Sequence, residues 1–200
     1  MINALVVWKN YLVVGGWFSA FSNGTSAKAI AYYNGYDWFT FPNDNTNNGI
    51  NGLVYSFAVF NNKLVIGGTF NSLGNTSVTV RNIVIYDNSN GISTWTVLPC
   101  GTNNGLNGAV NSMVSFHNKL YIGGSFTALS NNTVALKLAV YDPNTLTWDN
   151  WPIGNSFGVN AGVNRLYAPS EWSDNIHIGG GFTGANDGTT QFGYSVIVSY

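Results

Sequence analysis

Lys119-Leu120-Tyr121-Ile122-Gly123-Gly124-Ser125-Phe126 is a stretch that occurs four times in this chain. The other copies are YLVVGGWF at residues 11–18, KLVIGGTF at 63–70 and NIHIGGGF at 175–182. The Gly-Gly pairs begin at residues 15, 67, 123 and 179, so the spacings are 52, 56 and 56 residues. A period of about fifty residues in a pattern of short apolar strands is typical of propeller blades.

Each repeat predicts four short strands. The first is residues 110–116, with counterparts that begin at Ile2, Val54 and Val163, and the second carries the Gly-Gly pair. The third strand contains an apolar triplet, at residues 30–32, 84–86, 139–141 and 196–198. The fourth strand contains a tryptophan: Trp38, Trp95 or Trp148. The last repeat ends before a fourth strand.

The fold predicted from this order is all-β: a β-propeller of four-stranded antiparallel blades, the last of which lacks its fourth strand. The repeats span about residues 1–42, 43–98, 99–152 and 153–200, and we expect them to form a single propeller domain or propeller segment. Glycine is unfavourable inside a strand unless another backbone approaches closely or a bulge is needed. The aligned Gly-Gly pairs therefore indicate that packing between blades requires glycine.

The chain is nearly uncharged. Charged residues make up 8% of it, the net charge is -1, and asparagine occupies 30 of its 200 positions. This composition argues against a nucleic-acid partner, which would need a basic surface. No apolar run is long enough for us to expect insertion into a membrane. Cys100 is the single cysteine, so no disulfide can form within the chain.

The order Gly67-Gly68, Tyr86, Trp95 resembles the kelch repeat, and Gly123-Gly124, Tyr141, Trp148 repeats it. The longer form IGGSFT at residues 122–127 is similar to divergent kelch-like repeats of microbial cell-surface and cell-polarity marker proteins. This resemblance implies a propeller and leaves the function open, because kelch-like propellers include binding proteins and a few enzymes.

The chain departs from the kelch pattern in having four repeats, because kelch propellers usually have six or seven. Three alternatives stay open: a small propeller, a partial propeller completed by another chain, or a piece of a larger protein.

Catalytic signatures are weak. Metal sites favour clusters of His, Cys and carboxylates, and nothing in the sequence brings His117 and His177 together. Kelch-like copper oxidases use a Tyr–Cys cofactor with histidine ligands, and Cys100 with two histidines does not reproduce that set. No pair of carboxylates recurs at the close spacing that a glycosidase would need. We expect no enzyme activity and no cofactor or metal.

Aromatic and amide side chains are the better candidates for binding. Aromatics at repeat positions, such as Trp38, Trp95, Trp148, Phe70 and Phe126, are expected in the core between blades. The candidate binding surface consists of aromatics outside the repeat, amides of two loops on one face, and one arginine: Trp17, Trp151, Phe157, Trp172, Asn47, Asn48, Asn103, Asn104 and Arg165.

Arg165 stands where the other repeats place small residues in the first strand, such as Ala4 or Ser112. We expect it to line the central channel or to pair with a carboxylate. If its side chain pointed to solvent on the outer rim, the alignment of the repeats would be wrong.

Asn23, Asn75 and Asn131 form Asn-x-Ser/Thr sequences after each of the first three Gly-Gly pairs. They are formal glycosylation acceptors. The interpretation that we favour is structural, because asparagine tolerates left-handed backbone and caps its own turn.

Two classes of function remain. The first is a non-catalytic structural or protein-interaction propeller, such as a surface or virion component. The alternative is a lectin-like carbohydrate-binding module, and a kelch-like oxidase or a glycosidase-related enzyme is a distant third.

The ends of the repeat array also predict a partner. An open array would leave apolar faces on its first and last blades and a bare edge strand on the fourth, which folded proteins normally cover. We therefore expect association with another copy of the chain or with a larger protein assembly.

Overall fold

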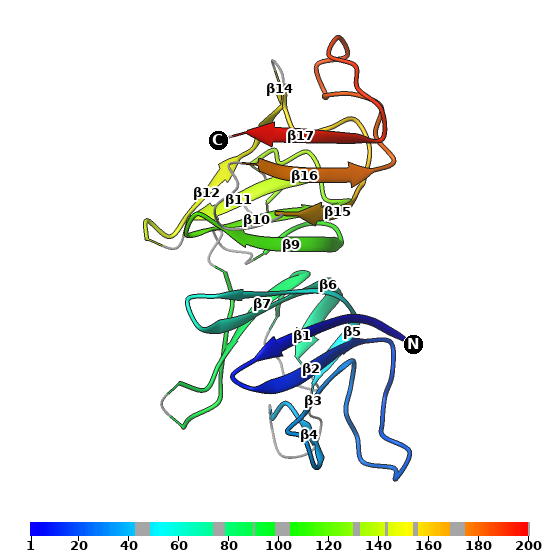
Figure 1. Cartoon of the computed structure of the whole chain (residues 1–200), viewed down its shortest axis with the longest axis vertical. Coiled ribbons are helices and arrows are strands. Elements are labelled where there is room, and N and C mark those ends of the chain that lie inside the picture. Colours follow the sequence, from blue (N-terminus) through cyan, green and yellow to red (C-terminus); the bar gives the residue numbers. More distant parts are fainter. Residues whose placement is uncertain are drawn as a thin grey trace. The chain divides into compact units, whose positions relative to one another are not determined.

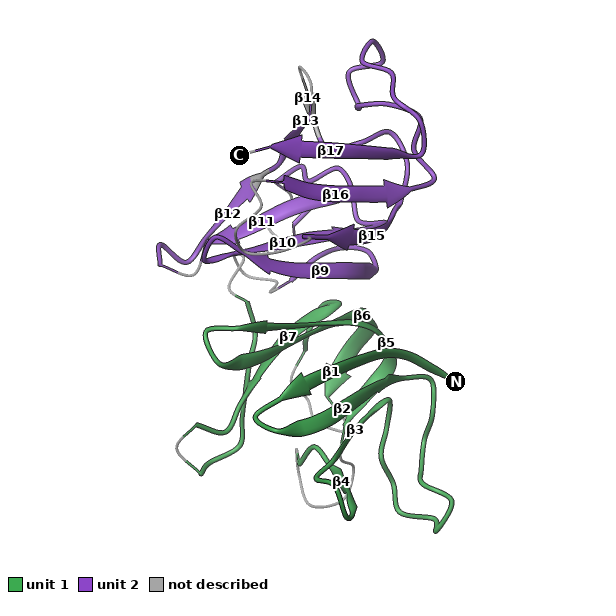
Figure 2. Cartoon of the chain, viewed as in Figure 1, with its two compact units in different colours: residues 1–98 green, residues 99–200 purple. Residues whose placement is uncertain are grey.

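A computed structural model gives the fold and describes residues 1–42, 49–73, 79–89, 91–98, 105–129, 133–142, 144–153, 156–168 and 175–199. All of the regular structure in these residues is β-strand (Figure 1). The chain forms two compact units, residues 1–98 and residues 99–200 (Figure 2). The described residues include no helix long and apolar enough to cross a membrane.

Unit 1 contains two antiparallel sheets of four strands each, in the orders β1-β2-β3-β4 and β5-β6-β7-β8. The strands of the first sheet are β1 (Ile2–Trp8), β2 (Tyr11–Gly16), β3 (Ile30–Tyr33) and β4 (Trp38–Thr40). Those of the second are β5 (Ile50–Phe60), β6 (Lys63–Leu73), β7 (Ile83–Asp87) and β8 (Thr94–Thr96).

Unit 2 contains a four-stranded sheet, a three-stranded sheet and a small hairpin. The four strands are β9 (Val110–Phe116), β10 (Lys119–Gly124), β11 (Leu138–Asp142) and β12 (Thr147–Asn150). The three are β15 (Val163–Tyr167), β16 (Asn175–Gly180) and β17 (Ser195–Ser199). The hairpin pairs β13 (Pro152–Ile153) with β14 (Ser156–Phe157).

The predicted fold class is confirmed: the chain is all-β, and its four antiparallel sheets are β-propeller blades, the last with three strands. The sheets of residues 1–40, 50–96, 110–150 and 163–199 are here called blades 1 to 4. The hairpin β13–β14 was not expected, because strands of two residues carry no periodic signal.

Two-residue turns connect the first two strands of the first three blades. Both residues have positive φ in each turn: Lys9-Asn10, Asn61-Asn62 and His117-Asn118. Positive φ at both central residues defines the hairpin turn that matches the twist of the strands, and asparagine tolerates it well. Part of the asparagine content therefore serves the hairpins.

Each unit has its own apolar core. The larger cluster in unit 1 includes Phe41 and Phe70, and that of unit 2 includes Trp151 and Phe182. The expected core positions of Phe70 and Phe126 are confirmed, since both are buried. Trp38 corrects the expectation for the repeat tryptophans, because its side chain is 44% exposed.

The first glycine of a pair makes room for the next blade. A Cβ atom added at Gly15 of blade 1 would lie 2.5 Å from Cγ1 of Val54 and 2.6 Å from Cζ of Phe57 in blade 2. A Cβ added at Gly123 of blade 3 would lie 2.5 Å from Cγ1 of Val163 in blade 4. At both junctions, the first strand of the following blade fills the space that a side chain would occupy.

A different contact explains why the second residue of each pair is glycine. A Cβ at Gly16, Gly68 or Gly124 would overlap the backbone carbonyl of Met1, Leu53 or Ala109. Each carbonyl belongs to the same blade as its glycine and lies next to a shift in the register between the first two strands. A bulge inside each blade, and not packing between blades, therefore explains this glycine.

Asparagine side chains also connect neighbouring blades. Asn3 Nδ2 donates to the carbonyl of Val54 at 3.1 Å, and Asn111 Nδ2 donates to the carbonyl of Val163 at 2.9 Å. Asn3 and Asn111 are equivalent residues of the repeat, and so are Val54 and Val163. The junction between blades 1 and 2 thus uses the same groups as the junction between blades 3 and 4.

Candidate functional site

The predicted surface residues that the structure describes are divided between the two units. Trp17 is exposed in unit 1, next to Gly16, and Arg165 is exposed in unit 2, so the two belong to separate units. Phe157 lies in β14, where its backbone pairs with Pro152. Asn47, Asn48, Asn103, Asn104 and Trp172 lie outside the described residues.

The prediction that Trp151 belongs to the binding surface is wrong, because this residue is only 2% exposed. Its ring packs against that of Tyr121, with the two ring centroids 4.9 Å apart. A repeat position that we overlooked explains this. Trp151 follows Trp148 by three residues, as Phe41 follows Trp38 and Leu98 follows Trp95, and all three followers are buried. The spacing after the repeat tryptophan was the signal that could have found it.

Arg165 occupies the predicted position of the first strand. It lies opposite Gly179 in the pairing of β15 with β16, as Ser112 lies opposite Gly123. Its side chain forms no salt bridge with any carboxylate of the described residues. The repeat alignment is therefore supported, the carboxylate pairing is not observed among these residues, and the channel position stays a prediction.

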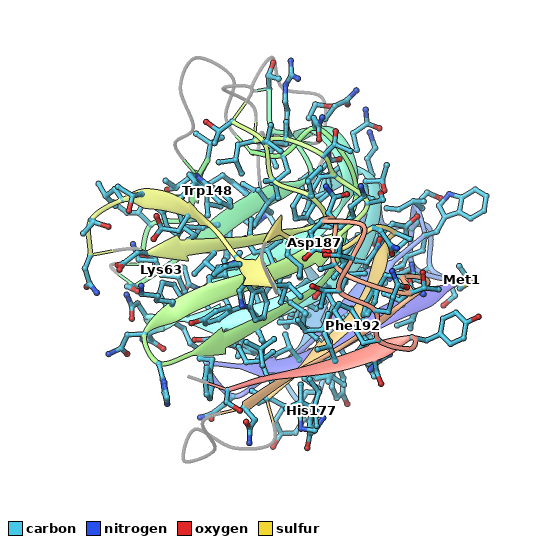
Figure 3. All side chains as sticks on the ribbon, turned by 90° about the horizontal axis from the view of Figure 1, so that it is seen from above. Met1, Lys63, Trp148, His177, Asp187 and Phe192 are labelled. Carbon is cyan, nitrogen blue, oxygen red and sulfur yellow. The ribbon has the colours of Figure 1, made fainter. Side chains whose placement is uncertain are left out.

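The two histidines lie on different elements of unit 2. The His117 ring stacks on Phe116 with centroids 4.0 Å apart, and His177 projects from β16 beside Tyr167 (Figure 3). Among the described residues, no three His, Cys, Asp or Glu side chains lie close enough to hold a metal ion.

Charged groups concentrate at the hairpin ends of the blades. Asp87 at the end of β7 lies 3.3 Å from Lys63 Nζ and 3.9 Å from Lys9 Nζ, and Asp142 lies 3.6 Å from Lys119 Nζ. Hydrogen bonds from Ser89, followed by the nearby Lys63, hold the pKa of Asp87 below its ordinary value. These groups stabilise turns and junctions, and we assign them no binding role.

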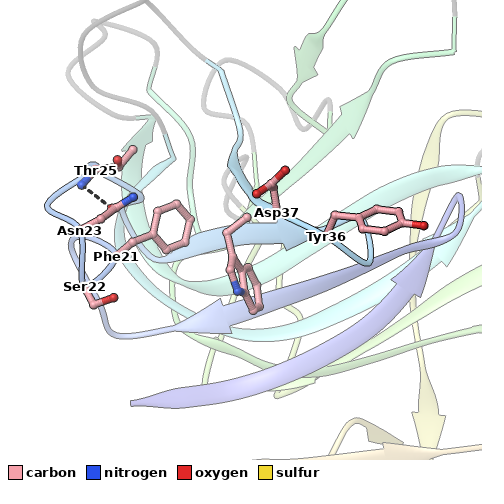
Figure 4. Close-up of a pocket in the computed structure, with 7 residues that line it drawn as sticks. Phe21, Ser22, Asn23, Thr25, Tyr36 and Asp37 are labelled. Carbon is pink, nitrogen blue, oxygen red and sulfur yellow. Dashed lines mark hydrogen bonds between the residues drawn. The ribbon is translucent and has the colours of Figure 1, made fainter.

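A hollow of about 270 Å³ lies at the surface of blade 1 (Figure 4). It is formed by the loop between β2 and β3 and by the turn between β3 and β4. Its lining combines aromatic, hydroxyl, amide and carboxylate groups: Phe21, Ser22, Asn23, Thr25, Tyr36, Asp37 and Trp38.

Two asparagine-capped turns shape the hollow. Asn23 Oδ1 accepts a hydrogen bond from the Thr25 amide at 3.0 Å, which confirms the turn interpretation for Asn23. Asn34 Oδ1 accepts from the amides of Tyr36 and Asp37, both at 2.8 Å. Both loops are therefore held by their own side chains.

The aromatic groups of the hollow are partly open to solvent. The rings of Phe21 and Trp38 lie 6.1 Å apart, and Trp38 also contacts Tyr33 at 5.1 Å. Tyr36 is 88% exposed, and in Figure 4 its ring extends away from Phe21. An aromatic face beside hydroxyl and amide groups is chemically suited to a small polar ligand with an apolar side.

The first and the last blade along the chain also expose unusual surfaces. On β1, the apolar side chains Ile2, Leu5 and Val7 are 57%, 62% and 68% exposed. On β16 of blade 4, a Cβ added at Gly179 would meet no atom within 4 Å. We name the first surface, formed by Ile2, Leu5 and Val7, the leading face. The second, formed by Asn164, Arg165 and Gly179, is the trailing face.

No family model matches the chain, and no curated protein matches it. The kelch-like resemblance therefore depends on the repeat residues alone. What the fold defines is a class, the proteins built of β-propeller blades, and this fold suggests a scaffold for protein interaction or other binding.

Proposed function

We propose that this chain is a non-catalytic propeller that acts through protein–protein contacts, as a structural component of a surface or virion assembly. The observation that carries the proposal is the leading face. Large apolar side chains standing free on an inner strand are normally covered in a folded protein, and contiguous exposed apolar groups mark interaction sites. The low charge of the chain supports an uncharged protein interface over a nucleic-acid or anionic surface.

Substitution on the leading face tests this proposal. Leu5→Asp places a charge among Ile2 and Val7, and it should abolish the association of the purified chain, measured by light scattering across a concentration series. The matched control is Ile92→Asp, since Ile92 is 70% exposed and lies between β7 and β8, outside the leading face. If Leu5→Asp and the unchanged chain associate alike, the leading face is not an interaction surface.

A second candidate function is carbohydrate binding, and the hollow of blade 1 is the observation that favours it. A sugar has apolar ring faces for Trp38 and hydroxyl groups for Asn23, Ser22 and Asp37. A single carboxylate, Asp37, lines the hollow, and this favours binding over hydrolysis, which uses two.

Glycan-array binding followed by titration of tryptophan fluorescence tests the second candidate. Trp38→Ala should weaken binding at least about tenfold, a loss of about 1.4 kcal/mol. Trp17→Ala is the control, because Trp17 is an exposed tryptophan of the same unit that does not line the hollow. Equal losses in both variants, or no glycan bound, would reject this function.

A further inference from the structure

The junctions inside the two units define what a blade requires of its neighbour. The following blade inserts a β-branched residue and a larger apolar residue over the first glycine: Val54 and Phe57 over Gly15, and Val163 and Leu166 over Gly123. The preceding blade donates one asparagine hydrogen bond to the same β-branched residue's carbonyl, at 3.1 Å and 2.9 Å.

The leading face carries the inserting half of this junction. Ile2 pairs with Gly16 in blade 1 as Val54 pairs with Gly68 in blade 2, so Ile2 is the equivalent of Val54 and Val163. Leu5 is likewise the equivalent of Phe57 and Leu166, since each lies opposite the residue before the Gly-Gly pair. Both Ile2 and Leu5 are exposed, although their equivalents Val163 and Leu166 are buried.

The trailing face carries the receiving half. Gly179 is the equivalent of Gly15 and Gly123, and the space in front of it is open. Asn164 follows Val163 as Asn111 follows Val110 and as Asn3 follows Ile2, and its side chain is exposed without a hydrogen bond to a described residue. The glycine and the asparagine donor are thus both present and unused.

One position departs from the pattern. Ser112 Oγ accepts a hydrogen bond from the Leu166 amide at 2.9 Å across the junction between blades 3 and 4, and Arg165 stands at the equivalent place on the trailing face. Ala4 also occupies this place in blade 1, and the junction between blades 1 and 2 forms without a hydroxyl there. The serine is therefore dispensable, and the apolar stem of Arg165 can lie along the interface with its charge at the rim.

We infer that the trailing face of one chain binds the leading face of a second copy, head to tail, with Ile2 and Leu5 of one copy over Gly179 of the other. Asn164 Nδ2 then donates to the carbonyl of Ile2. This inference rests on the proposed interaction role and names its partner. Two chains would bring eight blades together, within the range of roughly four to eight blades found in propellers. A head-to-tail contact either closes into such a ring or continues as a filament.

Gly179→Val is the decisive variant. A valine has open space at this position in the single chain, so the chain still folds, but its side chain fills the place of Ile2. We expect association to weaken at least about tenfold in sedimentation equilibrium, as for a residue at the centre of an interface. Gly181→Val is the control, because Gly181 also has no atom within 4 Å of an added Cβ and lies outside the trailing face.

Cross-linking tests the register directly. On a Cys100→Ser background, one chain carries Ile2→Cys and the other Gly179→Cys, and mixing them under mild oxidation should give a disulfide-linked heterodimer. The intrachain reference is Gly123→Cys with Val163→Cys, because an added Cβ at Gly123 lies 3.2 Å from Cβ of Val163, near the spacing of about 3.5–4.5 Å in disulfides.

The outcomes distinguish the head-to-tail pairing of two copies from the more general interaction role of the leading face. Loss of association in Gly179→Val, with the heterodimer formed, supports the head-to-tail pairing. Association that Leu5→Asp abolishes but Gly179→Val leaves intact overturns this pairing and keeps the interaction role. A chain that stays monomeric at high concentration, or a doubly substituted chain that cross-links only within itself, overturns the second copy as the partner.

Discussion

At the scale of single residues, Asn3 and Asn111 show how a polar side chain can define a junction between blades. Each amide reaches a backbone carbonyl 51 or 52 residues further along the chain. Both hydrogen bonds are partly buried, so deleting either asparagine amide leaves a carbonyl of the junction without this donor. Their equivalent in blade 4, Asn164, makes no such contact.

This difference gives the first prediction. Asn3→Ala and Asn111→Ala should each lower the free energy of unfolding by about 1 kcal/mol, the net worth of a typical hydrogen bond. Asn164→Ala should leave it unchanged in dilute solution. Urea unfolding followed by tryptophan fluorescence measures all three. Equal losses at the three positions would contradict the role assigned to the junction.

The first glycines of the pairs give the second prediction. Gly123→Ala places a methyl group 2.5 Å from Cγ1 of Val163 and 3.2 Å from Cγ of Leu166, so the junction must shift. Overpacking of this kind costs about 1–3 kcal/mol. Gly181→Ala meets no atom within 4 Å and should change stability by less than about 0.5 kcal/mol. A comparison of thermal unfolding midpoints separates the two, and a tolerated Gly123→Ala would contradict the packing argument.

Among single residues, Trp151 is one that the sequence analysis placed wrongly, on the surface instead of in the core. Its spacing to Trp148 indicates burial, but we assigned Trp151 to the surface because it lies outside the repeat positions that we recognised. The prediction for Trp38 was wrong in the opposite sense, because we expected it in the core. It keeps the repeat spacing, yet it is partly exposed and lines a hollow that two irregular loops create. Loop geometry of this kind depends on turn capping by both Asn23 and Asn34, and the repeat indicated only the turn at Asn23.

At the scale of elements, the strands were largely predictable because glycine pairs, apolar triplets and tryptophans recur at fixed distances. β9 has the predicted bounds, Val110–Phe116. β5 and β6 were predicted too short, since each extends to 11 residues, with a second register shift between Asn51 and Gly52. Such an extension depends on pairing between the two strands, and a single strand's pattern does not contain it.

The hairpin ends give the third prediction, which concerns pH. The pKa of Asp87 is lowered by folding, so its contribution to stability is present above the ordinary aspartate pKa of about 3.9 and is lost as pH falls through the lower folded value. Asp87→Asn should therefore reduce stability at pH 7, by about 1 kcal/mol or less for a pair this near the surface.

The stability difference between Asp87→Asn and the unchanged chain should shrink as the pH is lowered from 5 to 3, measured by urea midpoints. The matched control is Asp37→Asn, which removes an exposed carboxylate that forms no salt bridge within the described residues. A difference that grows on acidification would contradict the assignment, because it has the opposite sign.

At the scale of the whole molecule, each unit contains two blades and its own core. The core cluster of unit 1 includes Trp8 and Tyr86, and the cluster of unit 2 includes Phe116 and Ile178, so each cluster spans both blades of its unit. In repeat proteins, stability is roughly a sum of the units and their neighbouring interfaces.

The fourth prediction follows from these cores. Residues 1–98 alone should give a β-type circular dichroism spectrum and a cooperative urea transition with buried Trp8 as its reporter. The control is the same fragment with Gly15→Ala, which should unfold at a lower urea concentration because its only internal junction is damaged. A fragment without a cooperative transition would mean that one junction is too little to hold two blades.

The repeated junction has a consequence for how such a chain can change over generations. A Cβ atom added at Gly15 would lie 2.5 Å from Cγ1 of Val54, and one added at Gly123 would lie 2.5 Å from Cγ1 of Val163, so the junctions inside the two units use the same two complementary sides of a blade. Unequal recombination between neighbouring repeats would then add or delete a blade without any new interface having to arise. Copy number becomes a property that selection can alter in a single genetic event, while the outer loops of each copy remain free to diverge.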